Sequence, residues 1–145
     1  MKVVVQRVTH ASVTVDGNVC GKIGKGFLVL VGFAHEDTEA DCERIAKKMT
    51  GLRIFADEND KTNLSLKDVN GELLIISQFT LYADCMKKGY RPSFTNAMGA
   101  EEAQRLYEYF CELCRKEIPV VEKGIFGADM KVELFNDGPF TVILE

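Results

Sequence analysis

Residues 77–81, with the sequence Ser-Gln-Phe-Thr-Leu, carry the clearest potential for chemistry. They follow four apolar residues at 73–76. A buried strand there would deliver hydroxyl, amide and main-chain groups to its C-terminal end. Two main-chain N–H groups at such an end could bind a developing oxyanion, which contributes roughly 10²–10³ in rate per donor. The segment therefore predicts a site for acyl chemistry, whereas Thr80 taken alone would be an ordinary strand residue.

A second segment, residues 136–141 with the sequence Asn-Asp-Gly-Pro-Phe-Thr, lies close to the C-terminus. An X-Pro bond can adopt the cis form at a cost of only about 0.5–1 kcal/mol. Gly138, which precedes the proline, has no Cβ to keep other groups at a distance. The pattern predicts a turn that projects bare backbone into a pocket.

Histidine and cysteine offer weaker alternatives. The chain has two histidines, His10 and His35, and no spacing ties either one to Thr80, which disfavours a catalytic triad. Cys111 and Cys114 have the spacing of redox and zinc sites, but they fall inside a predicted helix rather than at its start. The five cysteines form an odd, scattered set, which favours reduced thiols in a cytosol. We expect neither a metal nor a cofactor.

Composition sets the remaining limits. The chain of 145 residues is 46% hydrophobic, which is enough for one domain over residues 1–145 with a real core. Its net charge of −4 argues against binding long stretches of nucleic acid. The basic cluster Lys87, Lys88 and Arg91 still permits a local phosphate contact. No apolar run reaches the roughly 20 residues of a membrane span, so we expect a soluble intracellular protein.

Hydrophobic periodicity predicts an α/β domain, a layered sandwich of mainly antiparallel β-sheet with two helices packed on one face. The expected helices cover residues 38–51, capped by Asp37 or Thr38, and 100–117, stopped by Pro119. Residues 56–63 and 82–95 are expected to be irregular. The expected strands are residues 2–8, 11–15, 18–23, 27–33, 52–55, 72–79, 130–134 and 140–144, the last two forming a final hairpin.

At these residues the chain resembles the D-tyrosyl-tRNA deacylase family of D-aminoacyl-tRNA deacylases, over nearly its whole length. Residues 77–81 match the first signature of that family, and residues 136–139 match the second, a Gly-cisPro motif. Residues 91–94 resemble a loop element, and residues 126–130 resemble a segment of the pocket wall. Segments 5–8, 11–13, 23–26 and 52–55 follow in the expected order.

The resemblance implies the D-tyrosyl-tRNA deacylase-like fold and hydrolysis of the ester that joins a D-amino acid, or glycine, to the terminal adenosine of tRNA. It implies a cytoplasmic homodimer with tRNA as its partner. Gly138 and Pro139 of one subunit would enter the active site of the other, with Arg7 holding that turn. The 2′-OH of the tRNA would assist water, while main-chain amides around Gln78, Phe79 and Thr80 stabilise the oxyanion. Catalysis by Thr80 as a covalent nucleophile is the rival mechanism.

The implied site residues fall into three groups. They are Ser77, Gln78, Phe79 and Thr80 for catalysis; Gly138, Pro139, Arg7, Phe126 and Met130 for substrate binding and chiral selection; and Lys87, Lys88 and Arg91 for contact with tRNA.

The sequence departs from the family pattern at three places. The loop at residues 85–89 is one residue longer than is common, and Tyr90 and Phe140 stand where the family more often has another residue. The first signature favours the D-specific group over related deacylases that act on L-alanyl-tRNA. Two other classes stay open: a non-catalytic nucleic-acid-binding module that uses residues 87–91, and a cysteine-based redox or zinc protein.

Overall fold

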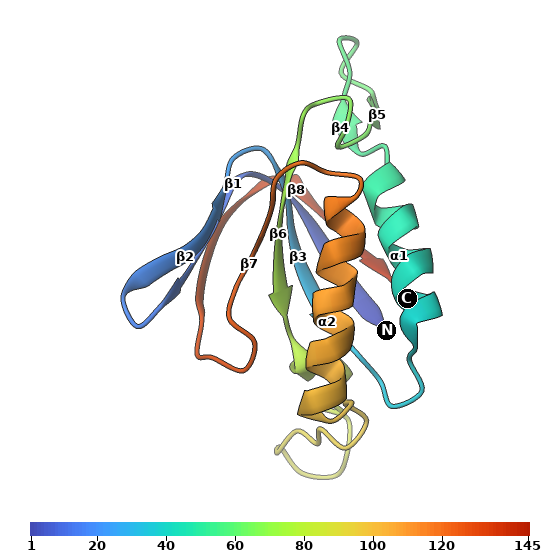
Figure 1. Cartoon of the computed structure of the whole chain (residues 1–145), viewed down its shortest axis with the longest axis vertical. Helices are drawn as coiled ribbons and strands as arrows, with labels where there is room; N and C mark the ends of the chain where they lie inside the picture. The colour runs from blue at the N-terminus through green and yellow to red at the C-terminus, as the bar shows by residue number, and fades with distance from the viewer.

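A single long strand, β1 (Lys2–Val15), organises the sheet in the computed structural model, which describes residues 1–145 (Figure 1). Its first half pairs antiparallel with β3 (Gly26–Gly32) and its second half with β2 (Asn18–Ile23). The prediction of two separate strands at 2–8 and 11–15 was wrong, because pairing with β8 (Lys131–Leu144) continues past the break. The turn between β1 and β2 lies at Asp16 and Gly17, which both have a positive φ.

The sheet extends beyond β3 through two parallel neighbours. β6 (Glu72–Ser77) pairs with β3, and β7 (Val121–Lys123) pairs with β6. The order is β2-β1-β3-β6-β7, with β8 on β1. β3 is buried along almost its whole length, as is typical of an apolar strand in the centre of a sheet. Strand β7 was not predicted, since three residues are too short to show a period.

Two helices, α1 (Glu39–Gly51) and α2 (Ala100–Arg115), lie side by side on one face of the sheet (Figure 1). Thr38 is the N-cap of α1 and forms a capping box with Asp41, because their side chains reach each other's main-chain amides. The predicted end of α1 at Gly51 is confirmed, while α2 ends at Arg115 rather than 117. Neither helix is long and apolar enough to cross a membrane.

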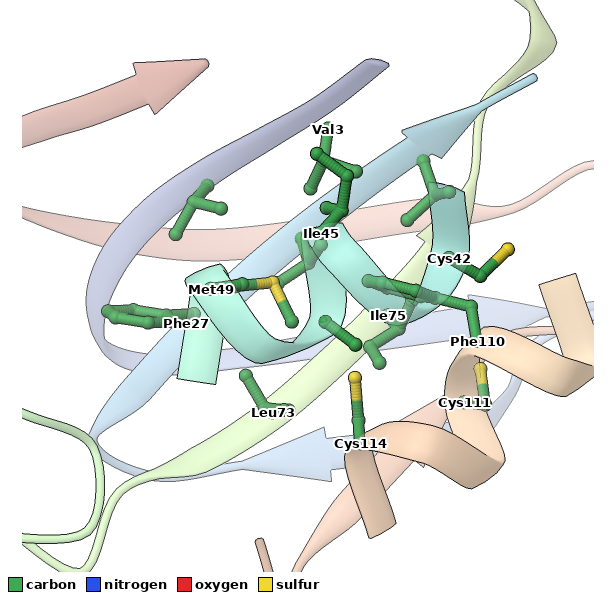
Figure 2. Close-up of a cluster of buried hydrophobic side chains, with 14 of the residues drawn as sticks. Val3, Phe27, Cys42, Ile45, Met49, Leu73, Ile75, Phe110, Cys111 and Cys114 are labelled. Carbon is green, nitrogen blue, oxygen red and sulfur yellow. The ribbon is translucent and has the colours of Figure 1, made fainter. Parts of the chain in front are cut away.

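The main core lies between this face and the helices. Figure 2 shows Ile45 and Met49 projecting from α1 toward the sheet residues Val3 and Phe27, with Phe110 entering from α2. A smaller cluster lies on the opposite face, where Met130, Val132 and Leu134 cover it. That cluster consists of Val8, Ala11, Val13, Ile23, Leu28, Leu74 and Ile76. Because β8 curls over this second face, the sheet is buried on both sides near the end of β6.

Three further expectations were wrong. The strand predicted at 52–55 is the two-residue β4 (Phe55–Ala56), and the polar stretch 56–63 contains its partner β5 (Thr62–Leu64). The C-terminal segment is not a hairpin, because β8 runs without reversal along β1. The Gly-Pro segment instead forms a bulge in β8, where Gln6 pairs with Thr141 and Val8 pairs with Asn136.

Phe110→Ala should destabilise the protein by about 3–5 kcal/mol, because the ring is 0% exposed and its loss leaves a cavity between α2 and the sheet. Urea unfolding followed by circular dichroism measures the change. Val19→Ala, at a side chain 60% exposed, is the control and should stay within about 0.5 kcal/mol of the parent. Equal losses in the two variants would contradict this account of the core.

Candidate active site

A pocket of about 250 Å³ lies where β3 and β6 end. Ser77, Gln78 and Phe79 line one side, and Phe126 and Met130 line the other. The second wall forms because the chain leaves the sheet after β7 and passes beside the end of β6 before β8 begins (Figure 1). The fold thus brings together five of the predicted site residues from segments about fifty positions apart.

The main chain of the first signature leaves two amides unpaired. The strand β6 ends at Ser77, and residues 79–82 form a 3₁₀ helix, η1 (Phe79–Tyr82). The Gln78 amide donates to the Val31 carbonyl at 2.7 Å, so it is already occupied. The N–H groups of Phe79 and Thr80 open the 3₁₀ helix and find no acceptor in the chain. The predicted group of three amides is therefore reduced to two.

The Thr80 hydroxyl is not linked to a base. Its Oγ1 accepts a hydrogen bond from the Gln78 side-chain amide. A ring nitrogen of His35 is hydrogen-bonded to the Thr95 carbonyl at 2.7 Å, and the His10 ring stacks on Phe135. Neither histidine contacts Thr80, so the chain assembles no triad at this residue.

Gly32 allows the close approach of β3 to the signature. A Cβ at this position would lie 2.8 Å from the Gln78 carbonyl oxygen and 3.1 Å from the Leu81 Cβ. Any other residue would therefore displace the segment that holds the free amides. Sequence reasoning missed Gly32 and also Met98, which lines the pocket from the loop before α2. A glycine that ends a buried strand was the available signal for the first; the second had none.

Aromatic rings surround the pocket. The Phe79 side chain is 56% exposed, and its ring meets the Phe94 ring edge to face at 5.2 Å. Phe126 packs on the ring of Tyr107, whose buried hydroxyl donates to the Ile75 carbonyl at 2.6 Å. Desolvation raises the pKa of that hydroxyl well above its usual range. Tyr107 therefore stays protonated, and its hydrogen bond ties helix α2 to the C-terminal half of strand β6.

The Gly-Pro segment forms a second, separate cluster around Arg7. The Gly138–Pro139 peptide bond is cis. The Arg7 guanidinium donates to the Asp137 carbonyl at 2.9 Å and to the Ile54 carbonyl at 2.6 Å. It also lies 4.7 Å from the centre of the Phe140 ring. Arg7 thus joins the bulge to the segment that precedes β4, and the contacts to Asp137 and Phe140 agree with the predicted link between Arg7 and this segment.

The side chain of Asn136 closes the bulge. Its oxygen accepts from the Phe140 amide at 2.8 Å, and its nitrogen donates to the Thr141 hydroxyl at 3.0 Å. Gly138 has a φ of +142°, and a Cβ there would lie 2.8 Å from the Phe140 nitrogen. The bulge therefore requires glycine, and Gly138 and Pro139 remain exposed at its tip.

The two clusters do not meet within one chain. Arg7 pairs with Phe27 and Ser77 pairs with Val31, so four residues of β3, about 13 Å, separate them along the strand. The β4–β5 hairpin that follows Ile54 lies at the end of the sheet opposite to the end of β6 (Figure 1). Neither Arg7, Gly138 nor Pro139 lines the pocket.

The three predicted RNA-contacting cations lie beyond the pocket on an exposed loop. Asp84 and Ser93 exchange main-chain hydrogen bonds of 2.7 and 3.0 Å at its base. Lys87, Lys88 and Arg91 occupy the part that extends from this base. The loop thus belongs to the same end of the molecule as the free amides, because Phe94 at its base contacts Phe79.

Cys111 and Cys114 face the main core from α2 (Figure 2). Both are buried with Cys42, and no group of three or more His, Cys, Asp or Glu residues is arranged to hold a metal ion. Desolvation raises the pKa of the Cys42 and Cys111 thiols to about 12 and raises that of Cys114 as well. Since only the thiolate reacts, this environment does not suit redox chemistry.

The sequence is similar to known deacylases over its whole length. The family model described as D-Tyr-tRNA(Tyr) deacylase matches residues 4–145. Proteins named D-aminoacyl-tRNA deacylase are 57% identical in Clostridium perfringens, 55% in Clostridium novyi and 52% in Clostridium acetobutylicum. Each comparison covers 100% of this chain and 97% of the relative.

Two solved structures have the same fold. One, described as c-Myc DNA Unwinding Element Binding Protein, is 45% identical with a TM-score of 0.93, covering 100% of this chain and 98% of that chain. The other, from a structural analysis of a probable eukaryotic D-amino acid tRNA deacylase, is 18% identical with a TM-score of 0.86, covering 99% and 97%. The second shows the fold alone, and together they confirm the predicted fold class.

Alkylation should separate the thiols into two classes. Near pH 8.5, the ordinary pKa of a thiol, iodoacetamide should modify the exposed Cys20 and Cys85 in the native protein. The other three should stay unmodified, because they are buried and desolvation raises their pKa well above about 8.5. Intact-mass measurement should give two adducts before unfolding in urea and five afterwards. Rapid native modification of Cys111 or Cys114 would contradict the structural role given to them.

Proposed function

The chain belongs to the D-Tyr-tRNA(Tyr) deacylase family, and we propose that it hydrolyses the ester of D-aminoacyl-tRNA to free amino acid and tRNA. The proposal rests on one observation above the others: relatives 52–57% identical over the full chain carry the name D-aminoacyl-tRNA deacylase. Residues 1–145 act as a single deacylase domain in the cytoplasm, and glycyl-tRNA(Ala) is a second substrate. No cofactor is required.

The free amides of Phe79 and Thr80 bind the oxyanion in this mechanism. Water adds to the ester carbonyl carbon, and the charge that develops on the carbonyl oxygen is received by these two N–H groups. The carbon–oxygen bond to the ribose then breaks, and the ribose oxygen takes up a proton. The absence of internal acceptors for both amides supports this role, because an unpaired N–H near a pocket is available to a ligand.

The substrate supplies the assistance that a histidine base gives elsewhere. The ester lies beside a vicinal 2′-OH on the terminal ribose, and this hydroxyl orients the attacking water. Ser77, Gln78 and Thr80 position the adenosine. The exposed Phe79 ring offers it a stacking surface, and Phe126 and Met130 form the opposite wall. The absence of a base bonded to Thr80 supports this division of labour.

Chiral selection comes from the Gly-Pro bulge of a second subunit. An enzyme that accepts many D side chains must read the configuration at Cα, and fixed backbone groups near Cα do this by clashing with the L form. Glycine lacks the clashing group and is accepted. Gly138 and Pro139 are exposed, and Arg7, which holds their bulge, lies about 13 Å along β3 from the pocket of its own chain, so a homodimer would let each bulge enter the opposite pocket.

A binding module without catalysis is the second candidate. Its support is the 45% identical structure described as a DNA Unwinding Element Binding Protein, together with the exposed cations Lys87, Lys88 and Arg91. This reading expects tight, salt-sensitive binding to nucleic acid that survives loss of Gly138 and Pro139. Finding such binding without hydrolysis of any D-aminoacyl-tRNA would favour it over the deacylase.

Thr80→Ala should keep deacylation within about tenfold of the parent, because the main-chain N–H remains when the hydroxyl is removed. Loss of a covalent nucleophile would instead lower kcat by several orders of magnitude, about 10⁶-fold for a serine of a protease triad. Single-turnover hydrolysis of D-aminoacyl-tRNA measures the rate, and circular dichroism checks the fold. Complete loss of activity in a folded variant would sink the main-chain mechanism.

Arg7→Ala should release chiral selection. A hydrogen bond from a charged donor contributes about 1.5–3 kcal/mol, so the preference for D over L should fall roughly 10–150-fold. Deacylation rates of the parent and the variant on D-aminoacyl-tRNA, L-aminoacyl-tRNA and glycyl-tRNA, measured side by side, test this. Equal rates on the D and L forms in the parent protein would refute the chiral assignment.

A mixed dimer tests whether the bulge acts across subunits. One subunit carries Phe79→Pro, which removes an oxyanion donor, and the other carries Arg7→Ala; the two are coexpressed with different tags and purified in tandem. If the bulge acts across subunits, the active pocket meets an intact bulge, and the dimer hydrolyses only the D ester. Hydrolysis of the L ester by the mixed dimer would place the bulge in its own chain's site. A dimer of Phe79→Pro with the parent is the control and should remain D-specific.

A further inference from the structure

The loop between Asp84 and Ser93 is anchored firmly at its base and exposed at its tip. Beyond the two main-chain bonds that join these residues, the Asp84 carboxylate accepts from the Met86 amide at 3.0 Å. The Ser93 and Thr95 hydroxyls lie 3.3 Å apart, and the Thr95 carbonyl is bonded to His35. The base therefore has a defined position relative to Phe79, through the ring of Phe94.

Two large apolar side chains stand at the tip without any protein neighbour to cover them. Met86 is 93% exposed and Tyr90 is 105% exposed, more than any other large hydrophobic residue of the chain. Neither the Tyr90 ring nor the Met86 thioether takes part in an aromatic pair or a cation–π contact within the chain. Two such exposed side chains on one short loop favour a ligand with a flat apolar face.

The charge around the tip identifies the chemistry of that ligand. Lys87 and Lys88 follow Met86, and Arg91 follows Tyr90; none of the three is paired with a carboxylate. Lys87 reaches only the Ser93 hydroxyl, at 3.5 Å. The chain as a whole carries a net charge of −4, so this cationic tip is a local exception. Cations interleaved with stacking groups complement a single-stranded nucleic acid, which offers phosphates and base faces in alternation.

The reach of the loop places the contact close to the pocket. Tyr90 is three residues from Ser93, so it lies at most about 10–11 Å from the base of the loop. A stacked strand advances about 3.4 Å per nucleotide, so this distance covers at most about three nucleotides. Three unpaired nucleotides, with the discriminator base among them, precede the terminal adenosine of a tRNA.

We infer that Tyr90 and Met86 stack on one of the three unpaired nucleotides before the terminal adenosine, while Lys87, Lys88 and Arg91 contact the adjoining phosphates. The inference rests on the proposed function, since it takes tRNA as the ligand and the pocket as the site of the adenosine. The contact is tolerant of base identity, because every base has a face on which a ring can stack. The loop thus holds the acceptor end in register while the ester lies at the amides.

Two substrates of different length test the contact. Tyr90→Ala should raise KM for D-aminoacyl-tRNA by about 5–100-fold with little change in kcat. Hydrolysis of 3′-(D-aminoacyl)adenosine, which lacks the preceding nucleotides, should stay within about twofold because nothing is left for Tyr90 to stack on. Tyr90→Phe keeps the ring and should restore the parent KM, and Met86→Ala should give a smaller rise than Tyr90→Ala. Val19→Ala, on an exposed surface of β2, is the control. An equal loss on both substrates, or no loss on either, would overturn the inference.

Binding of uncharged tRNA gives a reading that does not depend on hydrolysis. Parent and Tyr90→Ala are titrated with tRNA that is abasic at one of the three preceding positions in turn. At the stacked position, removing the base should abolish the difference in tRNA affinity between the two proteins. At the other positions, the loss of binding free energy from removing the base and the loss from Tyr90→Ala should add. If the losses of binding free energy add at all three positions, the inference is overturned. A weaker dimer in Tyr90→Ala would also overturn it, because Tyr90 would then contact the other subunit rather than the tRNA. A parent that binds tRNA in this way but hydrolyses no ester would refute the proposed function and leave the stacking contact intact.

Discussion

The pairing of β1 is the constraint on which both parts of the candidate site depend. One edge of this strand holds β3, which in turn fixes β6 and the segment where β6 ends. The other edge of β1 holds β8 over nearly its whole length. The bulge forms opposite Arg7, because β1 and β8 are paired both before and after this position. The free amides and the Gly-Pro tip therefore have fixed positions on one rigid sheet, although no side chain links them.

The sequence was sufficient to predict the helices and strands that are long enough to show a hydrophobic periodicity. The central strand β3, the helix α1 and its cap at Thr38 were predictable because burial and capping leave local signals. β4, β5 and β7 were not, since two or three residues cannot show a period and their pairing is set by tertiary contacts. The Gly-Pro segment misled because a turn and a bulge use the same residues, and only the partner strand distinguishes them.

The site shows the same division. Residues 77–81 and 136–141 were recognisable from residue type, and a family resemblance assigned them roles. The Gln78 amide is occupied, while the amides of Phe79 and Thr80 are free. This difference depends on the register between β3 and the start of η1. Register is a property of pairing and cannot be read from one strand alone. The closeness of Gly32 to the signature is invisible for the same reason.

The chemistry of the pocket lining limits how catalysis can work there. Asp129 is the only ionisable residue among the fifteen that line the pocket, and its carboxylate is paired with Lys131 at 3.1 Å. In the proposed reaction the rate comes from the placement of donors that are always protonated, rather than from a side-chain acid or base. Amide N–H groups meet that need, but only if their positions are held closely. The buried hydroxyl of Tyr107 on the Ile75 carbonyl, and the contact that Gly32 permits, therefore serve the proposed reaction as directly as the residues that face the substrate.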